Sequence, residues 1–410
     1  MKLKHSDRTA ARNGGKPAPG LWTVVEQGDR SRWLQTSEYT PVNVSRILEA
    51  ANEGDIAELA VAAREIQERN WEVILAMQVR KSALTGLDWG VDPGDDRPAS
   101  KDAAKAFEAA LRESGNEPGL ASFHELAGHL MDAVISPLAA AEIVWSAGGS
   151  LAGFRPVGAW HFTFRGSDTP LLVTADDYAG VPLPPAKLIV HTRGGAGDPA
   201  RAGLIRTLIW LHVFQNYPVK DLVSFVERYG MPFVVAKVDR NAWENERSVM
   251  RNLIRSFGPN GGGVFTKSTE LELLQASNAG GDVYFKLLEY TSKAITKVIL
   301  GQLASSSESG GLSGGDAQSR VRGDLLEADA RALESTIRTQ LAAPWVKFNF
   351  GDAAAVPVLR FRSSAREDHA VFAGIVETLH RAGLDADPEE ISARFGISLT
   401  RAGSAPEVRP

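Results

Sequence analysis

The sequence predicts an α+β protein in which long helices join a body that contains small sheets. Two stretches, 283–300 and 316–343, carry apolar residues at helical spacing. Short β-prone runs separated by Gly, Pro and Asp fill the region 139–191. The chain has 410 residues, of which 43% are hydrophobic and 23% charged, so it is long enough to bury a large core.

The first 200 residues should form an arm followed by a body. Residues 1–40 carry basic side chains and few large apolar groups, which predicts a flexible N-terminal arm. The α+β body should cover 41–200. Its predicted helices are 43–51, 56–85, 101–113 and 122–135, and its predicted strands are 87–91, 139–145, 153–157, 160–165 and 187–191. Within the helix 56–85, we expect the apolar side to carry Trp71, Ile74, Leu75 and Val79.

A long helix should follow over 201–229, with a kink or a restart at Pro218. Its apolar residues lie on nearly every side, and a helix of that kind needs burial from several directions. We expect part of that burial to come from neighbouring subunits. The predicted interface residues are Leu204, Leu208, Trp210, Leu211 and Phe214.

The stretch 230–282 should be a compact insertion between two helices. It contains a predicted strand, 233–238, and a predicted helix, 242–256. Two further strands, 264–266 and 270–274, are expected to pair as a hairpin.

The helix predicted over 283–302 has one apolar face and one basic stripe. Lys286, Lys293 and Lys297 stand at i, i+7 and i+11, which places them close to one line along a helix. Such a stripe is a solvated surface in most proteins. In a ring whose helices face a central channel, the same stripe would form stacked rings of positive charge.

A Ser/Gly tract, 303–315, separates this helix from a long helix at 316–345. Its side chains bury too little apolar surface to offset the entropy of ordering, so we expect a flexible loop. The loop residues of interest are Ser305, Ser306, Ser307, Glu308, Gly310, Gly311, Ser313, Gly314 and Gly315. The region 346–410 should contain a strand at 358–361 and helices at 367–382 and 388–395.

Charge and composition exclude several classes of protein. The net charge of -5 argues against a protein that coats nucleic acid by bulk electrostatics. The absence of cysteine excludes disulfides and thiolate metal sites. We find no signal peptide, and the longest apolar run, 208–214, is too short to span a membrane, so the chain is expected to be soluble.

Three motif matches fail on their context. Gly311–Gly315 fits the serine-hydrolase elbow, with Ser313 as the nucleophile, but follows a Ser-rich loop rather than a buried strand. His124 and His129 lie five residues apart, which separates them by about 140° on a helix and prevents a shared zinc ion. Gly261–Ser268 lacks one glycine of a phosphate-binding loop. We expect no enzyme activity, no metal site and no cofactor.

Several segments carry a resemblance to a known family. They are ITKVILGQ, RGDLLEADARALESTIRTQLAAPWVKFNFG, RNWEVILAMQVRKSALTGLDWGV at 69–91, and 202–231. These segments resemble the portal proteins of Mu-like tailed phages and prophages, and LLEADAR and LAAPWVKFNF are the most specific parts. The similarity covers most of the chain from about 40 to 385.

The resemblance implies a ring of about twelve subunits at one capsid vertex of the virion, through which double-stranded DNA passes without sequence preference. It implies a wing at 41–200, stem helices at 201–229 and 283–302, and a clip at 230–282. It further implies a tunnel loop at 303–315, a long wing helix at 316–345 and a crown side at 346–410.

The partners implied are further copies of the chain, the terminase large subunit, a head-tail connector or adaptor, and a major capsid or scaffold protein. Assembly would take place in the host cytoplasm, with no membrane partner. The alternatives are a non-portal head adaptor or minor head protein, and a serine hydrolase that uses Ser313.

Overall fold

The computed structural model describes residues 39–146, 149–194, 198–229, 233–237, 270–274, 281–301, 312–362, 369–383, 387 and 391–392. The predicted arm at 1–38, the predicted helix 242–256 and the predicted strand 264–266 lie outside these residues. The remainder combines helices with short strands, which confirms the α+β fold class.

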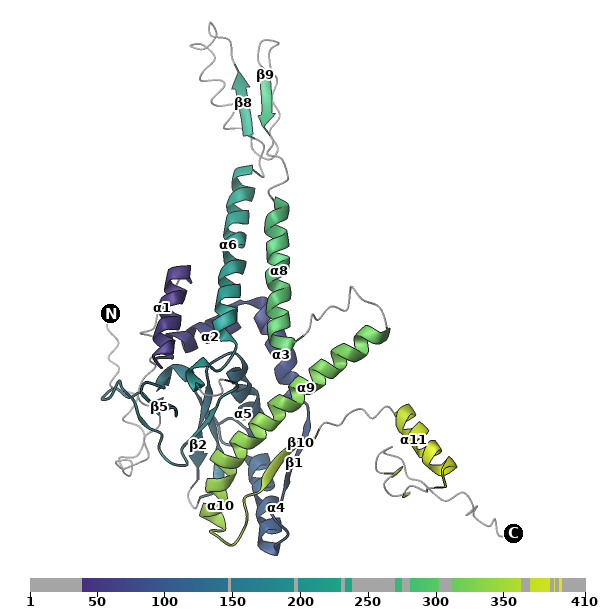
Figure 1. The fold of residues 1–410 in the computed structure, drawn as a ribbon. Coiled ribbons are helices and arrows are strands. Elements are labelled where there is room, and N and C mark those ends of the chain that lie inside the picture. Colours follow the sequence, from purple (N-terminus) through teal and green to yellow (C-terminus); the bar gives the residue numbers. More distant parts are fainter. Residues whose placement is uncertain are drawn as a thin grey trace.

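Five helices form one part of the body (Figure 1). They are α1 (Pro41–Asn52), α2 (Ala57–Arg69), α3 (Trp71–Thr85), α4 (Pro98–Glu113) and α5 (Phe123–Leu130). The prediction of one helix over 56–85 was wrong, because the chain breaks at Asn70. The Asn70 backbone is extended, and its side chain accepts hydrogen bonds from the amides of Glu72 and Val73 at the start of α3. Asparagine is a preferred residue at this capping position, and it begins a second helix here.

The break changes which face of α3 is buried. Trp71 and Leu75 are each 61% exposed and Ile74 is 40% exposed, although all three were predicted to lie on the buried side. The residues that α3 buries are instead Val73, Ala76, Met77 and Leu84. This face is covered because α3 contacts α2 and α5, and also the later helices α8 (Gly281–Leu300) and α9 (Leu312–Ile337).

Two small antiparallel sheets complete the body. The first has the order β3–β2–β7, with β2 (Ala139–Trp145) between β3 (Leu151–Val157) and β7 (Leu188–His191). The second joins β4 (Phe162–Thr163), β5 (Leu171–Leu172) and β6 (Val181–Pro182). Of the strand predicted over 160–165, only the two residues of β4 are a strand; the first two belong to a 3₁₀ turn, Ala159–His161.

A third pairing joins distant parts of the chain. Strand β1 (Asp88–Asp92) runs antiparallel to β10 (Val358–Arg362), with Gly90 opposite Arg360. Both strands were predicted, and their pairing was not. The pairing fixes the segment 358–362 against the body.

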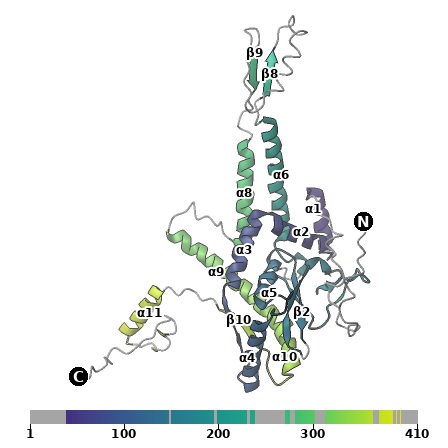
Figure 2. The ribbon, with the colours of Figure 1, turned by 180° about the vertical axis from the view of Figure 1, so that it is seen from behind.

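Two antiparallel helices, α6 (Ile205–Tyr229) and α8 (Gly281–Leu300), rise side by side from the body (Figures 1 and 2). Pro218 lies inside α6, which continues through it as a single helix. At the far end, β8 (Phe233–Lys237) pairs with β9 (Glu270–Leu274). The strand 270–274 was predicted, but its partner in the structure is β8.

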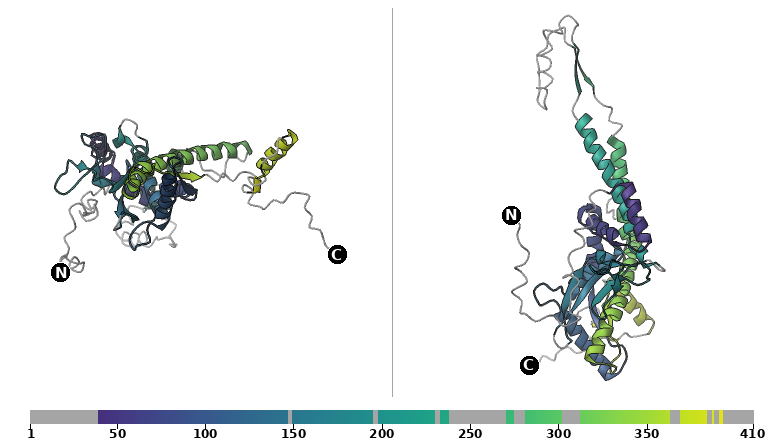
Figure 3. Two further views of the ribbon diagram at one scale, coloured as in Figure 1. Left: turned by 90° about the horizontal axis from the view of Figure 1, so that it is seen from below. Right: turned by 90° about the vertical axis from the view of Figure 1, so that its left-hand side faces the viewer.

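The long helix α9 (Leu312–Ile337) crosses the body, and its first part extends beyond it (Figure 3, left). A π-helical turn, Arg338–Ala342, and α10 (Ala343–Asn349) continue it. Because α9 begins before the predicted start at 316, Ser313, Gly314 and Gly315 lie in a helix rather than in a loop. The other predicted loop residues lie outside the described part of the chain. Helix α11 (His369–Arg381) follows β10, and only Ile391 and Ser392 of the last predicted helix are described.

Candidate functional site

The basic stripe of α8 faces directly away from the body. The buried residues of this helix are Thr291, Ile295 and Ile299, which are at most 1% exposed. The three lysines Lys286, Lys293 and Lys297 are all exposed. Because successive residues turn by about 100°, the stripe lies on the side of α8 opposite Ile295. The stripe is therefore available to a ligand or to another subunit.

One lysine of the stripe already has a carboxylate beside it. Lys293 Nζ lies 2.7 Å from Glu289 Oε1, one turn away on the same helix. The hydrogen bond and the positive charge of Lys293 lower the pKa of Glu289. Within the described residues Lys297 forms no ion pair, so its charge faces solvent without a neighbouring carboxylate.

A buried polar network holds the two projecting helices to the body. Asn70 Nδ2 donates to Gln215 Oε1 at 2.7 Å and lies 3.1 Å from His212 Nδ1. Gln215 in turn donates to Ser292 Oγ of α8 at 3.3 Å. Burial, and then the nearby Arg69 guanidinium, lower the pKa of His212. Asn70 therefore both begins α3 and anchors α6.

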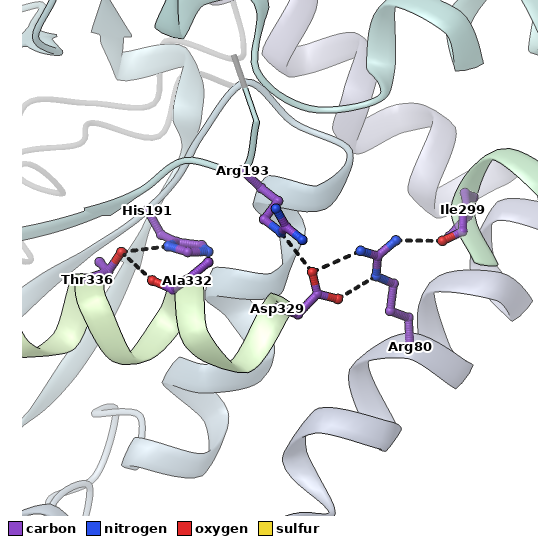
Figure 4. Close-up of polar contacts among 7 residues, drawn as sticks. All are labelled: Arg80, His191, Arg193, Ile299, Asp329, Ala332 and Thr336. Atoms are coloured by element: carbon purple, nitrogen blue, oxygen red, sulfur yellow. Dashed lines mark hydrogen bonds and ion pairs between the residues drawn. The ribbon is translucent and has the colours of Figure 1, made fainter. Parts of the chain in front are cut away.

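The base of α8 is fixed by a second polar cluster (Figure 4). The Asp329 side chain of α9 is fully buried and pairs with two guanidinium groups. Arg80 Nε donates to Asp329 Oδ2 at 2.6 Å and Arg80 Nη2 to Asp329 Oδ1 at 2.9 Å. Arg193, from the segment after β7, donates to Oδ1 at 2.8 Å. Arg80 Nη1 also donates to the Ile299 carbonyl at 2.6 Å.

This cluster joins α3, α8, α9 and the segment after β7 at one carboxylate. A buried ion pair is costly unless its remaining hydrogen-bonding groups also find partners. Here Arg80 uses a further N–H group to donate to the Ile299 carbonyl, which lies in the last turn of α8 and has no partner within the helix. The cation also lies at the negative end of the α8 dipole. The cluster therefore fixes the direction in which α8 leaves the body.

His191 extends the cluster along α9 (Figure 4). Thr336 Oγ1 donates its one hydrogen to the Ala332 carbonyl at 3.1 Å, so it accepts the bond from His191 Nδ1 at 2.8 Å. Burial, followed by the positive charge of Arg193, lowers the pKa of His191 to about 4, while Asp329 acts in the opposite direction. His191 is neutral at pH 7.

The predicted subunit-interface residues differ in exposure. Leu208 is 1% exposed within its own subunit, so its assignment to an interface was wrong. It lies on the side of α6 that packs against the body and α8. Leu204, Trp210 and Leu211 are half-buried, and Phe214 is 50% exposed. The Trp210 and Phe214 rings stack, with their centroids 6.0 Å apart.

The enzyme motifs find no support in the part of the chain that the structure describes. His129 Nε2 lies 2.9 Å from the Ala140 carbonyl and Nδ1 lies 3.4 Å from Asp132, and the described residues contain no group of metal ligands. Ser313 lies in the first turn of α9. The Gly261–Ser268 stretch lies outside the described residues. No described helix is long and apolar enough to cross a membrane.

Residue-level reasoning from the sequence missed the Asp329 cluster, although its signal was present. Arg80 and Asp329 both lie in segments that carry the family resemblance, at 69–91 and in LLEADAR. The sequence does not show that these side chains are buried, so the signal was only their positions in these two segments; Arg and Asp are almost never buried without a partner.

Comparisons with known proteins agree with this architecture. The family model described as the portal protein of Mu bacteriophage matches residues 61–397. The Mu-like prophage FluMu protein gp29 of Haemophilus influenzae is 27% identical over 351 residues, which cover 82% of this chain and 66% of that protein. The portal protein of Escherichia phage Mu is 27% identical over 341 residues, which cover 78% and 63%. The chain thus spans slightly less than two thirds of the length of these relatives.

The fold also occurs in a solved particle. A chain from the neck of a native gene transfer agent particle, computed with C12 symmetry, aligns with a TM-score of 0.51 and 10% identity. The alignment covers 88% of this chain and 95% of that chain. Because the family model matches most of the residues, this chain belongs to the family of the portal protein of Mu bacteriophage.

Proposed function

We propose that this chain is one subunit of a closed ring at a capsid vertex of the virion, and that the ring is a conduit for double-stranded DNA. The observation that carries the proposal is the pair α6 and α8. These helices project together from the body, and α8 presents Lys286, Lys293 and Lys297 on its free face (Figure 1). Repeated around an axis, the lysines become rings of positive charge.

Weak binding suits a conduit better than tight binding. Each phosphate that a protein neutralises adds affinity that depends on salt, and tight contacts would slow a sliding duplex. The chain has a net charge of -5, and Glu289 offsets part of the positive stripe. This charge distribution supports passage of DNA rather than storage.

In such a ring, we assign roles to the β8–β9 pair and to the body as well. The β8–β9 pair at the far end of the stem is a clip that receives the terminase large subunit and later the head-tail connector. The body is a wing that contacts the major capsid or scaffold protein. Assembly takes place in the host cytoplasm, and ATP hydrolysis belongs to the terminase.

Electron microscopy of the purified full chain tests the proposal. We expect rings with a central hole, with a number of subunits near twelve, since the related neck chain occurs in a C12 arrangement. Light scattering after gel filtration should give the matching mass. A strict monomer at micromolar concentration across several salt concentrations would contradict the proposal, and an open assembly of lower symmetry would favour a head adaptor.

A further inference from the structure

One edge of the stem carries a row of aromatic side chains, one half-buried and two exposed, which we call the α6 ridge. It consists of Trp210, Phe214 and Tyr217, which stand at i, i+4 and i+7 and therefore share one face of the helix. Phe214 is 50% exposed and Tyr217 is 43% exposed. Aromatic anchors at this spacing are typical of a helix that binds in a groove.

A different edge carries an apolar groove between α3, α8 and α9, which we call the α3/α8/α9 groove. Its volume is about 260 Å³. Leu75 and Val79 come from α3, Leu300 from α8, and Leu325 and Leu326 from α9. Leu75 is 61% exposed although it lines this groove. The groove leaves apolar surface open to solvent, as a docking site for another chain would.

The α6 ridge and the groove belong to opposite sides of the stem. In two opposite views, α1 lies beside α6 on one side of the helix pair, and α9 leaves the base of α8 on the other side (Figures 1 and 2). Two different surfaces on opposite edges of one subunit are what a head-to-tail ring requires.

The lower end of the ridge and the groove overlap in height along the stem, where Trp210 lies level with the stretch of α8 between Thr296 and Leu300. The antiparallel helices place Gln215 beside Ser292, so Leu300 at the end of α8 lies level with the first turn of α6. The Arg206 guanidinium donates to Asn52 at 2.9 Å, which places the end of α1 at this same level. Rotation about an axis along the stem preserves height, so the two surfaces can meet in a ring.

Nearer the β8–β9 end of the stem, which we call the upper level, the charges beside the α6 ridge and those of the groove are of opposite sign. Arg69 and Lys220 line a pocket next to Tyr217, and neither has a carboxylate partner among the residues that the structure describes. At the corresponding level of the groove stands Glu72, which accepts a hydrogen bond from Trp71 Nε1 at 3.1 Å. No described cation pairs with Glu72.

At the lower level, that of Leu300 and the end of α1, the charges are again of opposite sign, but here the groove carries the positive charge. Arg322 lines the groove near Leu300, is exposed, and has no described carboxylate partner. Glu49 and Glu53, near the end of α1, are exposed and also lack a described partner. The order of charges along the α1/α6 edge is thus the reverse of the order along the groove.

We propose that the α6 ridge of one copy docks in the α3/α8/α9 groove of the next copy. Lys220 and Arg69 then face Glu72, and Glu49 and Glu53 face Arg322. The inference rests on the proposed ring and identifies the two surfaces that close it.

A mixing experiment tests this assignment. Phe214→Glu disables the ridge, and Leu75→Glu disables the groove, while both positions are exposed enough that the subunit should still fold. We expect each variant alone to be monomeric. An equimolar mixture should give dimers and nothing larger, because only the ridge of the Leu75→Glu copy and the groove of the Phe214→Glu copy can still bind.

Controls separate this inference from the proposed function. Tyr178→Glu, at a residue that is 69% exposed elsewhere in the body, should leave ring assembly intact. Circular dichroism should show the same melting behaviour for all variants. If the wild type forms rings and either single variant still does so, the surfaces are wrongly assigned while the ring stands. A wild-type protein that stays monomeric would overturn both the proposed ring and the assignment of its two surfaces.

A charge exchange provides an independent test. Lys220→Glu and Glu72→Lys should each raise the protein concentration needed for half assembly by roughly 2- to 5-fold, as expected for partly exposed ion pairs. The double variant should recover part of this loss, because the exchanged pair at positions 220 and 72 again joins opposite charges while Arg69 stays a cation. Additive losses in the double variant would contradict the pairing.

Discussion

At the scale of single residues, Asp329 is a buried carboxylate that depends on its two cationic partners. Its side chain is fully buried between Arg80 and Arg193. Asp329→Ala should lower the free energy of unfolding by about 3–5 kcal/mol, because it leaves two cations without their carboxylate. Denaturant unfolding measures this loss.

The matched control for Asp329 lies on the same helix. Asp324 is exposed, and Asp324→Ala should change stability by no more than about 0.5 kcal/mol. Equal losses in the two variants would show that the ion pairs do not hold the α8 and α9 junction.

His191 gives the stability a dependence on pH. Its pKa falls from 6.5 in the unfolded chain to about 4 in the folded one, so below pH 6.5 the unfolded state binds more protons. Stability should therefore fall as the pH drops from 6.5 towards 4, by up to about 3 kcal/mol from this group. His191→Gln should remove that contribution. Unfolding curves for the wild type and the variant at pH 7, 5.5 and 4.5 check this, and parallel pH profiles would contradict it.

At the scale of elements, Gly301 decides how α8 meets α9. Its φ is +69°, and a Cβ there would lie 3.1 Å from side-chain atoms of both Val321 and Leu325. Gly301→Ala should cost about 1–2 kcal/mol, because an L-residue is strained in this left-handed conformation and the two side chains must move.

Gly323 provides a control of opposite sign. It lies inside α9, and a Cβ at this position would meet no other atom within 4 Å. Gly323→Ala should stabilise the protein by up to about 1 kcal/mol, since alanine has the higher helix propensity. Thermal unfolding of both variants compares them. A destabilised Gly323→Ala would contradict the expectation that a Cβ at position 323 is accommodated without a clash, and an unaffected Gly301→Ala would contradict the close approach at Gly301.

The basic stripe of α8 should act on DNA rather than on folding. Replacing Lys286, Lys293 and Lys297 with glutamine should change the free energy of unfolding by no more than about 0.5 kcal/mol, because all three are exposed. DNA retention or translocation should change, with a shallower salt dependence than in the wild type.

Packaging or ejection assays at low and high salt measure this effect. Replacing Lys101, Lys105 and Lys347, which are exposed elsewhere, controls for the loss of three charges. Unchanged behaviour of the stripe variant at both salt concentrations would remove these lysines from the channel lining and leave the ring proposal in place.

At the scale of the whole molecule, we expect the β8–β9 region, proposed above as a clip, to be separable from the body. Strands β8 and β9 pair with each other at the far end of the stem (Figure 1). Replacing residues 230–280 with a short Gly/Ser linker should leave the thermal stability of the body and the formation of rings unchanged. Docking of the terminase large subunit should be lost. A variant that fails to fold would show that the insertion contributes to the core.

The sequence by itself determined most of the elements and the family. The periodicity over 283–300 predicted α8 and its lysine stripe, and β-prone runs predicted β2, β3 and β10. These features follow from residues that are close in the sequence, where helical or alternating spacing fixes which side chains share a face. The segments at 69–91 and around LLEADAR indicated the portal family.

Only the tertiary structure decided which faces meet. Periodicity placed Leu208 on an apolar helix but did not show that its own subunit covers it. The break at Asn70, the pairing of β1 with β10 and the burial of Asp329 between Arg80 and Arg193 all depend on partners far away in the chain. Local spacing gives each residue a direction, whereas the neighbour found in that direction depends on the path of the whole chain.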